Sequence, residues 1–361
     1  MQLLPALESG GVERATLETG AALVAAGRRS LVVSAGGRLV APLEQAGSTH
    51  FTLDLGRKSL RTLRHVHSLR RLLERERPAI VHARSRLPAW IAHFALAGMS
   101  GPRPAFVTSV HGLNSPGRYS AILTRGERVL CVSRTVRDYV LQHYPATDAG
   151  RLRVIEPGID LQAFPRDHAP SAAWREAFFA QWPALAGGRL LTLPGRGTRL
   201  KGHVDAVRLL ARLRGGDCDA RLLLLGARET GRDGYLLELE RLARTLGVHQ
   251  QLVITPPRPD VRDVLAQSDL VLQLSTRPEA FGRTAAEALS LGRPVLGYGH
   301  GGIGEILAAN FLGGAVAPGD IDALVARARE WLRTPPVVPR YAGPTLAQSQ
   351  QATLALYAEL A

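Results

Sequence analysis

The sequence contains few residues of the kinds that build disulfide-linked or zinc-stabilised folds. Two cysteines occur in 361 residues, Cys131 and Cys218, and they lie far apart without metal-ligand spacing. This count excludes a disulfide framework, argues against a zinc site and favours a reducing compartment. Aromatic residues make up only 5% of the chain. Because zinc-finger, RNA-recognition and helix-turn-helix signatures are also missing, we expect no nucleic-acid partner.

Long apolar runs are missing too. No stretch approaches the ~20 residues that a membrane-spanning helix needs, and the apolar segment 90–97 is short and interrupted. The first residues lack the charged and apolar regions of a signal peptide. We therefore expect a cytoplasmic chain.

What the chain does contain is an alternation of short β-branched or Leu-rich runs with helical patterns. This order is typical of βα units around parallel sheets. A prior of ~150 residues per domain divides the 361 residues into two domains. We place them at 1–165 and 166–344, followed by a C-terminal helix at 345–361. The predicted fold class is α/β, with two doubly wound Rossmann-like domains.

Positive charge is unevenly distributed along the chain. The net charge is +14, and residues 1–165 carry 22 Lys and Arg against 12 Asp and Glu. Much of this excess lies at 57–77, where apolar residues at helical spacing predict an amphipathic helix with a basic face. Such a helix is either a solvated outer surface or a surface that attracts anionic lipid headgroups. In the second case the protein is peripheral on the inner face of the cytoplasmic membrane.

Two glutamates separated by seven residues flank a Phe-Gly turn in the C-terminal third. Residues 269–275 resemble a buried parallel strand, so Glu279 lies just past a strand end, and Glu287 lies in the next helix's first turn. Ligands of open α/β sheets bind at the carboxyl ends of strands, and a helix N-terminus offers N–H groups to an anion. The arrangement suits a nucleotide diphosphate, with carboxylates for a ribose and for the group that the phosphate carries.

Glu287 also has a purely structural interpretation. The segment Thr284-Ala285-Ala286-Glu287 fits a capping box, in which Thr284 caps the helix and Glu287 reaches back to it. Glu279 precedes the helix in a Pro-Glu-Ala-Phe-Gly loop, where no cap explains it. Glu279 is therefore the firmer site residue of the two.

Glycine-rich turns lie between a strand and a helix in both halves. Residues 194–202 carry three cations and have Leu200 at the third glycine position of a dinucleotide fingerprint, which favours a phosphate clamp. Lys201 is one of only two lysines among 45 basic residues, which favours a specific role for its ammonium group. In the N-terminal half, Gly10 and Gly11 form either a tight turn or a point where the backbone approaches a ligand.

A histidine and two aspartate pairs complete the candidate residues. His111 ends a strand of the N-terminal half, where it is either structural or a site residue, and we expect the second. Two Asp-x-Asp segments, 217–219 and 320–322, match a known metal-binding pattern. The first precedes its strand, and the second starts a helix where Asp caps are expected. We interpret both as structural, and we predict no metal and no cofactor.

Together these segments resemble glycosyltransferase family 4, retaining sugar-nucleotide transferases with two Rossmann domains. The glutamate block and the Gly-Arg-Pro strand that follows it are the specific part of the match. The N-terminal segment is most similar to proteobacterial enzymes that build lipopolysaccharide core or related envelope glycans. The matching segments run nearly end to end: 10–14, 110–112, 132–133, 157–160, 195–202, 279–287 and 301–305.

The resemblance implies a GT-B arrangement, with two domains facing across a cleft and the C-terminal helix returning to the N-terminal domain. Glu279 and His111 would both contact the donor sugar, one from each domain, and Glu287 would hold the ribose. Arg277-Pro278 replaces a small or apolar pair of many members, which leaves the sugar open. The other implied donor-binding residues are Gly10, Gly11, Arg196, Lys201, Arg258, Phe281, Gly282, Arg283 and Thr284.

The resemblance predicts a retaining transferase that moves a hexose-type sugar from a nucleotide-sugar, with UDP expected. The predicted acceptor is an anionic, lipid-anchored envelope glycan such as lipopolysaccharide core. Two other functions stay open at this point. One is a nucleotide-sugar epimerase on the same architecture, and the other is a non-catalytic, membrane-associated nucleotide-sugar binding protein.

Overall fold

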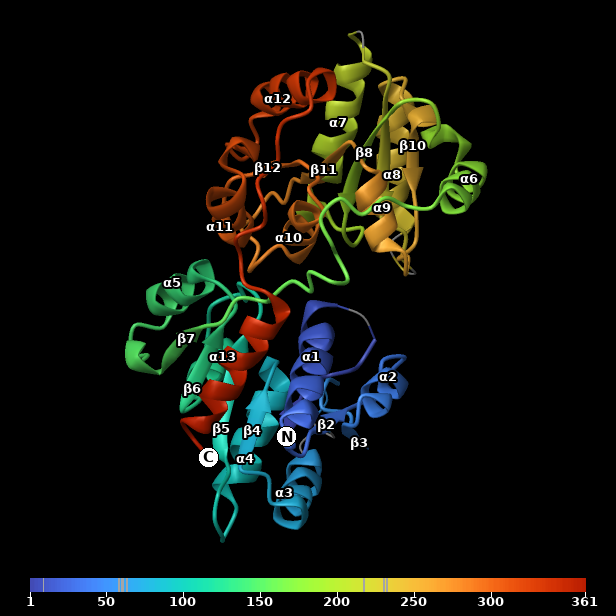
Figure 1. Cartoon of the computed structure of the whole chain (residues 1–361). Helices are drawn as coiled ribbons and strands as arrows, with labels where there is room; N and C mark the ends of the chain where they lie inside the picture. Colours follow the sequence, from blue (N-terminus) through green and yellow to red (C-terminus); the bar gives the residue numbers. More distant parts are fainter. Residues whose placement is uncertain are drawn as a thin grey trace. The chain divides into compact units, whose positions relative to one another are not determined.

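The computed structural model describes residues 1–8, 10–57, 59, 62, 64–216, 218–229, 231 and 233–361. These residues form two compact units (Figure 1). Unit 1 contains Met1–Gly158 and Pro344–Ala361, and unit 2 contains Ile159–Gly343. The last helix of the chain therefore belongs to unit 1, as the family resemblance implied.

Unit 1 is built on a parallel seven-stranded sheet with the order β3-β2-β1-β4-β5-β6-β7. The chain starts in the middle, runs to one edge and then returns to build the other half. Most strands are short buried runs, as expected where helices cover both faces of a parallel sheet. The strands are β1 (Gln2–Leu3), β2 (Leu31–Ser34), β3 (Thr49–Thr52), β4 (Ile80–Ala83), β5 (Ala105–Val110), β6 (Arg128–Cys131) and β7 (Leu152–Val154).

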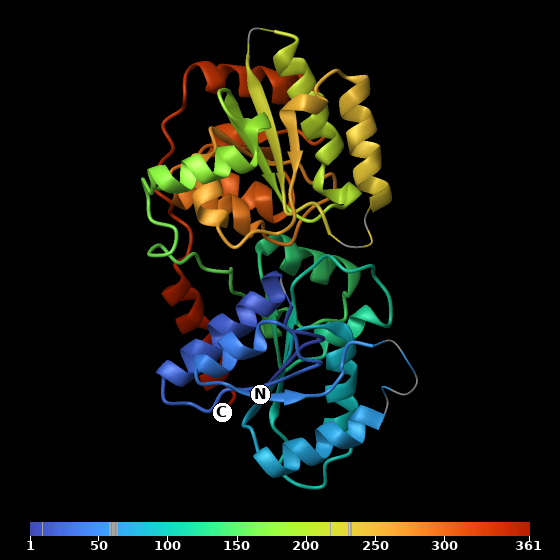
Figure 2. The ribbon, with the colours of Figure 1, turned by 90° about the vertical axis from the view of Figure 1, so that its right-hand side faces the viewer.

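Helices cover both faces of this sheet. In Figure 2, α1 and α13 lie on one side of it, and α3 and α4 lie on the other. Ser133 caps α5 by accepting the N–H of Val136. The helices of unit 1 are α1 (Gly11–Ala25), α2 (Val40–Gln45), α3 (Arg64–Glu76), α4 (Arg86–Ala97), α5 (Arg134–His143) and α13 (Leu346–Ala358), with short 3₁₀ turns η2 (Ser120–Thr124) and η3 (Ala149–Arg151).

Unit 2 repeats the architecture with six parallel strands in the order β10-β9-β8-β11-β12-β13. Both sheets are parallel and doubly wound, which confirms the predicted fold class. The strands of unit 2 are β8 (Arg189–Pro194), β9 (Ala220–Leu225), β10 (Leu252–Ile254), β11 (Leu270–Gln273), β12 (Val295–Tyr298) and β13 (Ala315–Val316).

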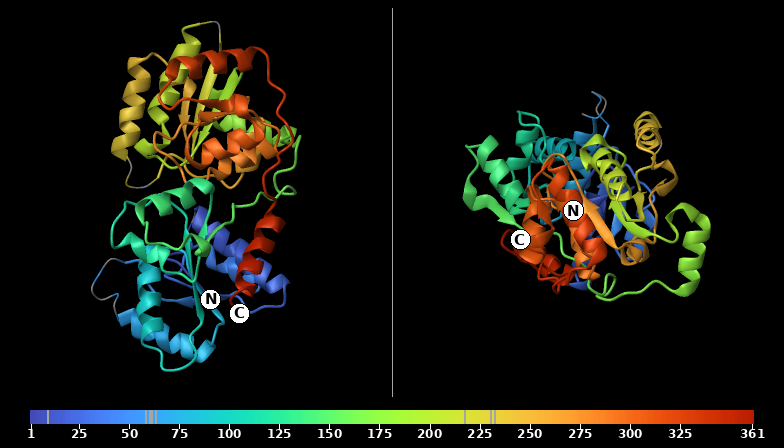
Figure 3. Two further views of the ribbon diagram at one scale, coloured as in Figure 1. Left: turned by 90° about the vertical axis from the view of Figure 1, so that its left-hand side faces the viewer. Right: turned by 90° about the horizontal axis from the view of Figure 1, so that it is seen from above.

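The helices of unit 2 also flank its sheet on two sides. In the left panel of Figure 3, α8 (gold) lies on one side of the strands, and the orange helices α10 and α11 lie on the other. Asp320 caps α12 by accepting the N–H of Ala323, which is the structural role predicted for that aspartate. The helices are α6 (Ala172–Gln181), α7 (His203–Arg214), α8 (Asp233–Thr245), α9 (Val261–Gln267), α10 (Arg283–Ser290), α11 (Gly301–Asn310) and α12 (Ile321–Arg333), with 3₁₀ turns η4 (Pro183–Leu185), η5 (Arg199–Lys201), η6 (His249–Gln251) and η7 (Leu312–Gly314).

The basic helix predicted at 57–77 is shorter in the structure, because α3 starts at Arg64. The Asp54 carboxylate accepts the N–H groups of Gly56 and Arg57 at 3.2 and 3.1 Å. Side-chain to backbone bonds of this kind compete with helix formation, so the helix does not begin at residue 57. Four residues of the predicted helix lie outside the described residues: Lys58, Leu60, Arg61 and Leu63. Asp217, from the first aspartate pair, also lies outside them.

A buried polar network ties α13 to the sheet of unit 1. The Tyr357 hydroxyl lies 2.6 Å from Nδ1 of His82, and Nε2 of His82 contacts the Ser109 hydroxyl. Arg84 lies beside this pair and donates, at 2.8 Å each, to an amide oxygen of β1 and a hydroxyl of α1. Because buried polar groups require partners, the C-terminal helix completes the interior of the first unit.

Candidate active site

Polar loops follow three neighbouring strands of unit 2. β8, β11 and β12 are adjacent and parallel, so their carboxyl ends meet at one edge of the sheet. Residues 195–202 follow β8, residues 274–282 follow β11, and residues 299–302 follow β12. This edge is where open α/β sheets bind ligands.

Lys201 and Glu279, which the sequence singled out separately, form an ion pair at this edge. Nζ of Lys201 lies 2.5 Å from Oε1 of Glu279, and the side chains are 26% and 23% exposed. The Ser275 hydroxyl donates to the same carboxylate oxygen. Because both side chains remain partly exposed, their charges are accessible to a polar ligand.

The end of β12 holds the Glu279 loop in place. Gly301 has φ 61°, and an added Cβ would lie 2.7 Å from both the backbone N and O of Glu279. The N–H of Gly302 donates to the carbonyl oxygen of Glu279 at 2.8 Å. Nε2 of His300 lies 2.7 Å from the carbonyl oxygen of Ser275. A side chain larger than glycine at 301 would therefore displace the loop that carries the carboxylate.

Helix α10 starts directly after a glycine in the left-handed region. Gly282 is its N-cap with φ 109°, and an added Cβ would lie 2.7 Å from Cγ1 of Ile303. The N-cap residue supplies no capping side chain. The first N–H groups of a helix have no partner within the helix, and its dipole adds partial positive charge. This helix start is therefore suited to bind a phosphate.

The alternative interpretation of Thr284 and Glu287 as a capping box is wrong. Thr284 lies inside α10, and its Oγ1 accepts a hydrogen bond from Nε2 of Gln273 at 2.7 Å. Glu287 lies two residues further into the helix than a capping glutamate, and only 2% of it is exposed. The reason is the left-handed backbone of Gly282. It makes Gly282 the N-cap, so α10 begins at Arg283, before Thr284 could act as a cap. Phe281, just before that turn, is buried as well.

The loop after β8 lies close against the Lys201 side chain. Gly195 has φ 149°, and an added Cβ would lie 3.2 Å from Cδ and Cε of Lys201. Gly202 has φ 73°, and its Cβ would lie 1.9 Å from the carbonyl oxygen of Leu274. Glycine at both positions lets the loops that carry Lys201 and Glu279 approach each other. Arg196 is exposed in the same loop and, among the described residues, makes no ion pair.

His203 supports this loop from the first position of α7. It is fully buried, and its Nδ1 lies 3.2 Å from the carbonyl oxygen of Thr198. Burial lowers the pKa of His203 to about 4, and nearby Lys201 adds to the decrease. The ring is therefore neutral at pH 7, and its Nδ1–H donates to Thr198.

Arg258 is engaged by its own loop and by α6. Its Nε and Nη2 donate to the two carboxylate oxygens of Asp260 at 2.9 and 2.7 Å. Nη1 donates to Gln181 at 3.1 Å, and the guanidinium carbon lies 5.5 Å from the centre of the Phe178 ring. The Trp174 indole N–H also donates to Asp260. Arg258 thus holds the loop after β10 in shape.

The predicted site residues of unit 1 lie where strands of its own sheet end. Gly10, with φ 146°, is the N-cap of α1, and an added Cβ on Gly11 would meet nothing within 4 Å. His111 directly follows β5 and lines a pocket of about 40 Å³ together with Arg84 and residues of α1 and α13. The site residues that unit 2 brings to one edge of its sheet are Gly195, Lys201, Glu279 and Gly282.

Sequence reasoning missed three polar residues that support this edge: Ser275, His300 and His203. Ser275 and His300 each lie two residues past the end of a strand, β11 and β12. A polar residue just past a strand end was the signal that the sequence offered, because the same position identified His111. His203 carried no such signal, because its contact with Thr198 depends on how the loop folds.

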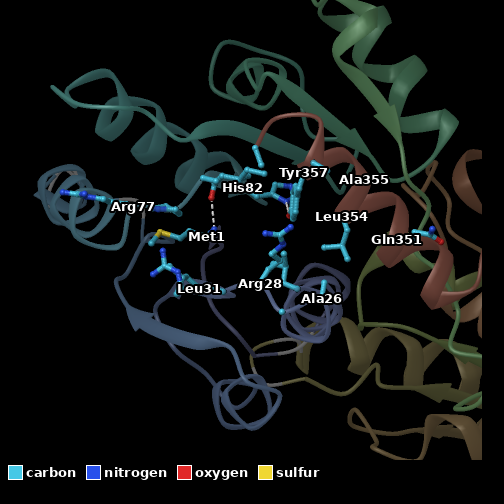
Figure 4. Close-up of a pocket in the computed structure, with 18 residues that line it drawn as sticks. Met1, Ala26, Arg28, Leu31, Arg77, His82, Gln351, Leu354, Ala355 and Tyr357 are labelled. Atoms are coloured by element: carbon cyan, nitrogen blue, oxygen red, sulfur yellow. Dashed lines mark hydrogen bonds between the residues drawn. The ribbon is translucent and has the colours of Figure 1, made fainter.

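A larger pocket, of about 970 Å³, lies elsewhere in unit 1 (Figure 4). It is lined by residues that precede β2 and β4, such as Arg28 and Arg77, and by α13 residues such as Leu354. None of the predicted site residues lines it. It lies at the amino ends of the strands, opposite the edge where such sheets bind ligands.

Among the described residues, no group of three or more His, Cys, Asp or Glu side chains is placed to hold a metal ion. None of the helices described is both long enough and apolar enough to span a bilayer.

Two Rossmann-like units, with a lysine–glutamate pair beside a helix start suited to an anion, are the arrangement expected of sugar-nucleotide-dependent transferases. The family models give the family. The model "Glycosyltransferase Family 4" matches residues 9–163, and "Glycosyl transferases group 1" matches residues 175–342. Together they cover most of both units, and the chain belongs to the family 4 glycosyltransferases.

Curated relatives are similar over part of their length. The D-inositol 3-phosphate glycosyltransferase of Xylanimonas cellulosilytica is 29% identical over 188 residues, covering 52% of this chain and 44% of the relative. That of Jonesia denitrificans is 34% identical over 166 residues, covering 44% and 38%. The chain spans less than half the length of these two relatives.

Solved structures share the whole fold. A glycosyltransferase from Rickettsia africae has a TM-score of 0.80 and 25% identity, covering 99% of this chain and 93% of that one. Anabaena HepE in complex with UDP and glucose has a TM-score of 0.80 and 20% identity, covering 99% and 96%. WaaG, a glycosyltransferase of lipopolysaccharide biosynthesis, has a TM-score of 0.70 and 18% identity, covering 99% and 96%.

Proposed function

We propose that this chain is a retaining glycosyltransferase whose donor is a nucleotide-sugar, with UDP as the nucleotide. The observation that carries the proposal is the 2.5 Å ion pair between Lys201 and Glu279, at the strand edge where α10 starts. A cation and helix N–H groups suit a diphosphate, and a carboxylate suits the hydroxyls of a sugar. The choice of UDP as the nucleotide is supported by HepE, which shares this fold and has been solved with UDP-glucose.

In the proposed complex the nucleotide binds to unit 2. Arg196 and Lys201 bind the diphosphate, and the backbone of residues 281–284, which includes Arg283, covers its phosphates. Glu287 holds the ribose hydroxyls. The base lies at the loop after β10, which Arg258 keeps in shape through Asp260.

The donor sugar is the reacting group. We propose that Glu279 contacts it from unit 2 and that His111 contacts it from unit 1. Gly10 and Gly11 present backbone without side chains at the start of α1, so they leave room for the donor.

The chemistry follows from the charge that develops during transfer. Breaking the bond between sugar and diphosphate leaves negative charge on the diphosphate and oxocarbenium character on the sugar. Lys201, held by its ion pair with Glu279, and the N–H groups of α10 are in place before that charge develops, so they stabilise it without reorganising. Arg196 supplies a second cation from the same loop. The acceptor oxygen bonds to the sugar on the face that the diphosphate leaves, which retains configuration, and the acceptor's proton passes to the leaving phosphate. We propose no covalent nucleophile, no metal and no cofactor.

The proposed acceptor is an anionic, lipid-anchored envelope glycan such as lipopolysaccharide core. The basic balance of residues 1–165 favours an acidic partner. The similar D-inositol 3-phosphate glycosyltransferases are named for a phosphorylated acceptor, and WaaG acts in lipopolysaccharide biosynthesis. Such an acceptor would bring the protein to the inner face of the cytoplasmic membrane.

The proposal is tested by a melting-temperature screen with UDP-, GDP- and ADP-sugars, followed by transfer assays with a phosphorylated lipid glycan. A ligand that binds only the folded state raises the melting temperature, and we expect the largest increase with a UDP-sugar. Transfer should be lost in Glu279→Ala. It should persist in the control Glu330→Ala, which removes an exposed carboxylate on α12.

Other outcomes would assign a different function. An isomerised sugar nucleotide formed without any acceptor would identify an epimerase. A raised melting temperature with neither transfer nor donor hydrolysis would identify a non-catalytic nucleotide-sugar binding protein.

A further inference from the structure

Unit 1 carries an exposed aromatic and cationic surface that the proposed donor site does not use. It is formed by α4 and by the segment that leads into η2. Phe94 is 46% exposed and Tyr119 is 39% exposed, which is unusual for large apolar side chains. We name this surface the aromatic–arginine patch; it consists of Arg86, Trp90, Phe94, Tyr119 and Arg125.

Contacts among its members organise the patch. The rings of Trp90 and Phe94 stack with centroids 5.5 Å apart, and the Trp90 indole N–H donates to the carbonyl oxygen of Tyr119 at 3.0 Å. The guanidinium of Arg86 lies 5.3 Å from the centre of the Tyr119 ring, and that of Arg125 lies 5.9 Å from the centre of the Trp90 ring. The side chains are therefore held in place in the absence of any ligand.

The charge of the patch is uniformly positive. Residues 77–126 contain six arginines and no aspartate or glutamate. Within the described residues neither Arg86 nor Arg125 has a carboxylate partner. The neighbouring helix α3, whose Arg70 donates to the carbonyl oxygen of Ala95 on α4, adds further exposed arginines. A partner of this surface has to be anionic.

The apolar part of the patch indicates which anionic partner fits. Burial, with Arg125 as a second cause, lowers the pKa of His93 on the same helix, so this histidine is neutral at pH 7. Arginines lie over the Trp90 and Tyr119 rings, and Phe94 leaves an exposed ring beside them. An exposed apolar ring next to guanidinium groups suits the boundary between lipid headgroups and acyl chains.

We propose that the aromatic–arginine patch docks unit 1 on an anionic lipid surface. Phe94 enters the interface, while Arg86 and Arg125 bind lipid phosphates. This inference deepens the proposed function, since a lipid-anchored acceptor is met at a membrane, but the docking itself requires no sugar transfer. It differs from the neighbouring basic segment 57–77 because it offers large exposed aromatic side chains as well as charge.

The test measures how the full-length protein partitions onto vesicles of phosphatidylglycerol with phosphatidylcholine, and onto phosphatidylcholine alone. We expect Phe94→Ser to lower partitioning onto the anionic vesicles about ten-fold, at low and at high salt, because it removes apolar area. Arg86→Gln and Arg125→Gln should each lower it about five-fold at low salt and much less at high salt.

Matched controls come from unit 2. Leu312→Ser removes an apolar side chain that is 71% exposed, and Arg212→Gln removes an exposed arginine paired with Asp322. Both should partition like the unmodified protein. All of these side chains are on the surface, so melting temperatures should show that every variant folds.

Three results would overturn the proposal. The first is equal partitioning of Phe94→Ser and Leu312→Ser, and the second is equal binding of anionic and neutral vesicles. The third is concentration-dependent self-association that Phe94→Ser abolishes while vesicle binding is absent, which would make the patch a contact between copies. Melting-temperature shifts with UDP-sugars, recorded on the same samples, separate this outcome from a failure of the proposed function.

Discussion

At the scale of single residues, Lys201 shows how position gives a common charge a specific role. The chain contains 45 lysines and arginines, and most of the arginines are exposed to solvent. Lys201 differs because its stem lies against Gly195 and its ammonium group meets Glu279 at the strand edge. A compact ammonium at that point pairs with the carboxylate and remains accessible to a diphosphate.

Replacing Lys201 by alanine should therefore lower turnover about 100-fold, the scale of losing one preorganised charge contact. The substitution removes the cationic partner of Glu279, and among the described residues no second cation contacts that carboxylate. Turnover with a UDP-sugar donor is the measurement. The control is Arg212→Ala, which removes an exposed arginine near the opposite end of α7, where it pairs with Asp322. Near-normal turnover of Lys201→Ala would remove this residue from the site.

At the scale of elements, the glycine turn after β12 determines where the Glu279 loop lies. An added Cβ on Gly302 would lie 2.4 Å from Cα of Phe281 and 2.7 Å from the carbonyl oxygen of Ala280. Both are backbone atoms, so the clash cannot be relieved by rotating a side chain. Because residue 302 has no Cβ, α11 can pack directly against the backbone that leads into α10.

Gly302→Ala should lower the free energy of unfolding by about 1–3 kcal/mol, because overpacking a tight contact shifts the backbone. It should also weaken UDP binding by moving the N–H groups at the start of α10. Urea unfolding and calorimetric titration with UDP measure the two effects. Gly313→Ala is the control in the same unit, since its Cβ would meet no atom closer than 3.5 Å. If both variants behave alike, the turn does not position the site.

Two helices show why a local capping pattern is insufficient evidence. Thr345 and Gln348 form a true capping box at α13, where the Thr345 side chain accepts the N–H of Gln348 and the Gln348 side chain accepts that of Thr345. The similar pattern Thr284 to Glu287 at α10 forms none, because the helix already begins at Arg283. The difference lies in Gly282, whose left-handed backbone packs against Ile303 from a later helix. That contact is tertiary and leaves no trace in the local sequence.

At the scale of the whole molecule, each unit contains a buried neutral histidine. Burial holds the pKa of His82 well below its usual value, with Arg84 and His111 as further causes. Burial likewise lowers the pKa of His203 to about 4, with Lys201 adding to the decrease. The unfolded chain binds protons on both residues below their ordinary pKa of about 6.5, whereas the folded chain does not.

Stability should therefore fall as the pH decreases from about 6.5 towards about 4, with a slope that approaches about 1.4 kcal/mol per pH unit for His203, and His82 should add to the decrease in the same direction. Urea unfolding across this range measures the slope. His203→Asn keeps a donor for the Thr198 carbonyl oxygen but cannot take up the proton, so its slope should be smaller by one histidine. An unchanged slope would mean that His203 is protonated in the folded state.

Prediction from sequence succeeded where local patterns carry the information. Buried runs alternating with helical spacing predicted parallel sheets, and the structure confirmed them in both units. Asp320 was assigned as a helix cap because caps depend on a few adjacent residues. The basic helix was predicted too long. The Asp54 carboxylate accepts the backbone N–H groups of Gly56 and Arg57, and these bonds compete with helix formation at the predicted start.

The sequence by itself determined the order of βα units and the location of Glu279 and Lys201 just past strand ends, because alternation and periodicity are local properties. Only the tertiary structure decided that these two side chains, 78 positions apart, form one ion pair. It also decided that Tyr357 contacts His82 across 275 positions, a buried contact that ties the last helix to the sheet of unit 1. The physical reason is strand order: β8 and β11 become neighbours through pairing in the sheet, and no local pattern of residues encodes which strands pair.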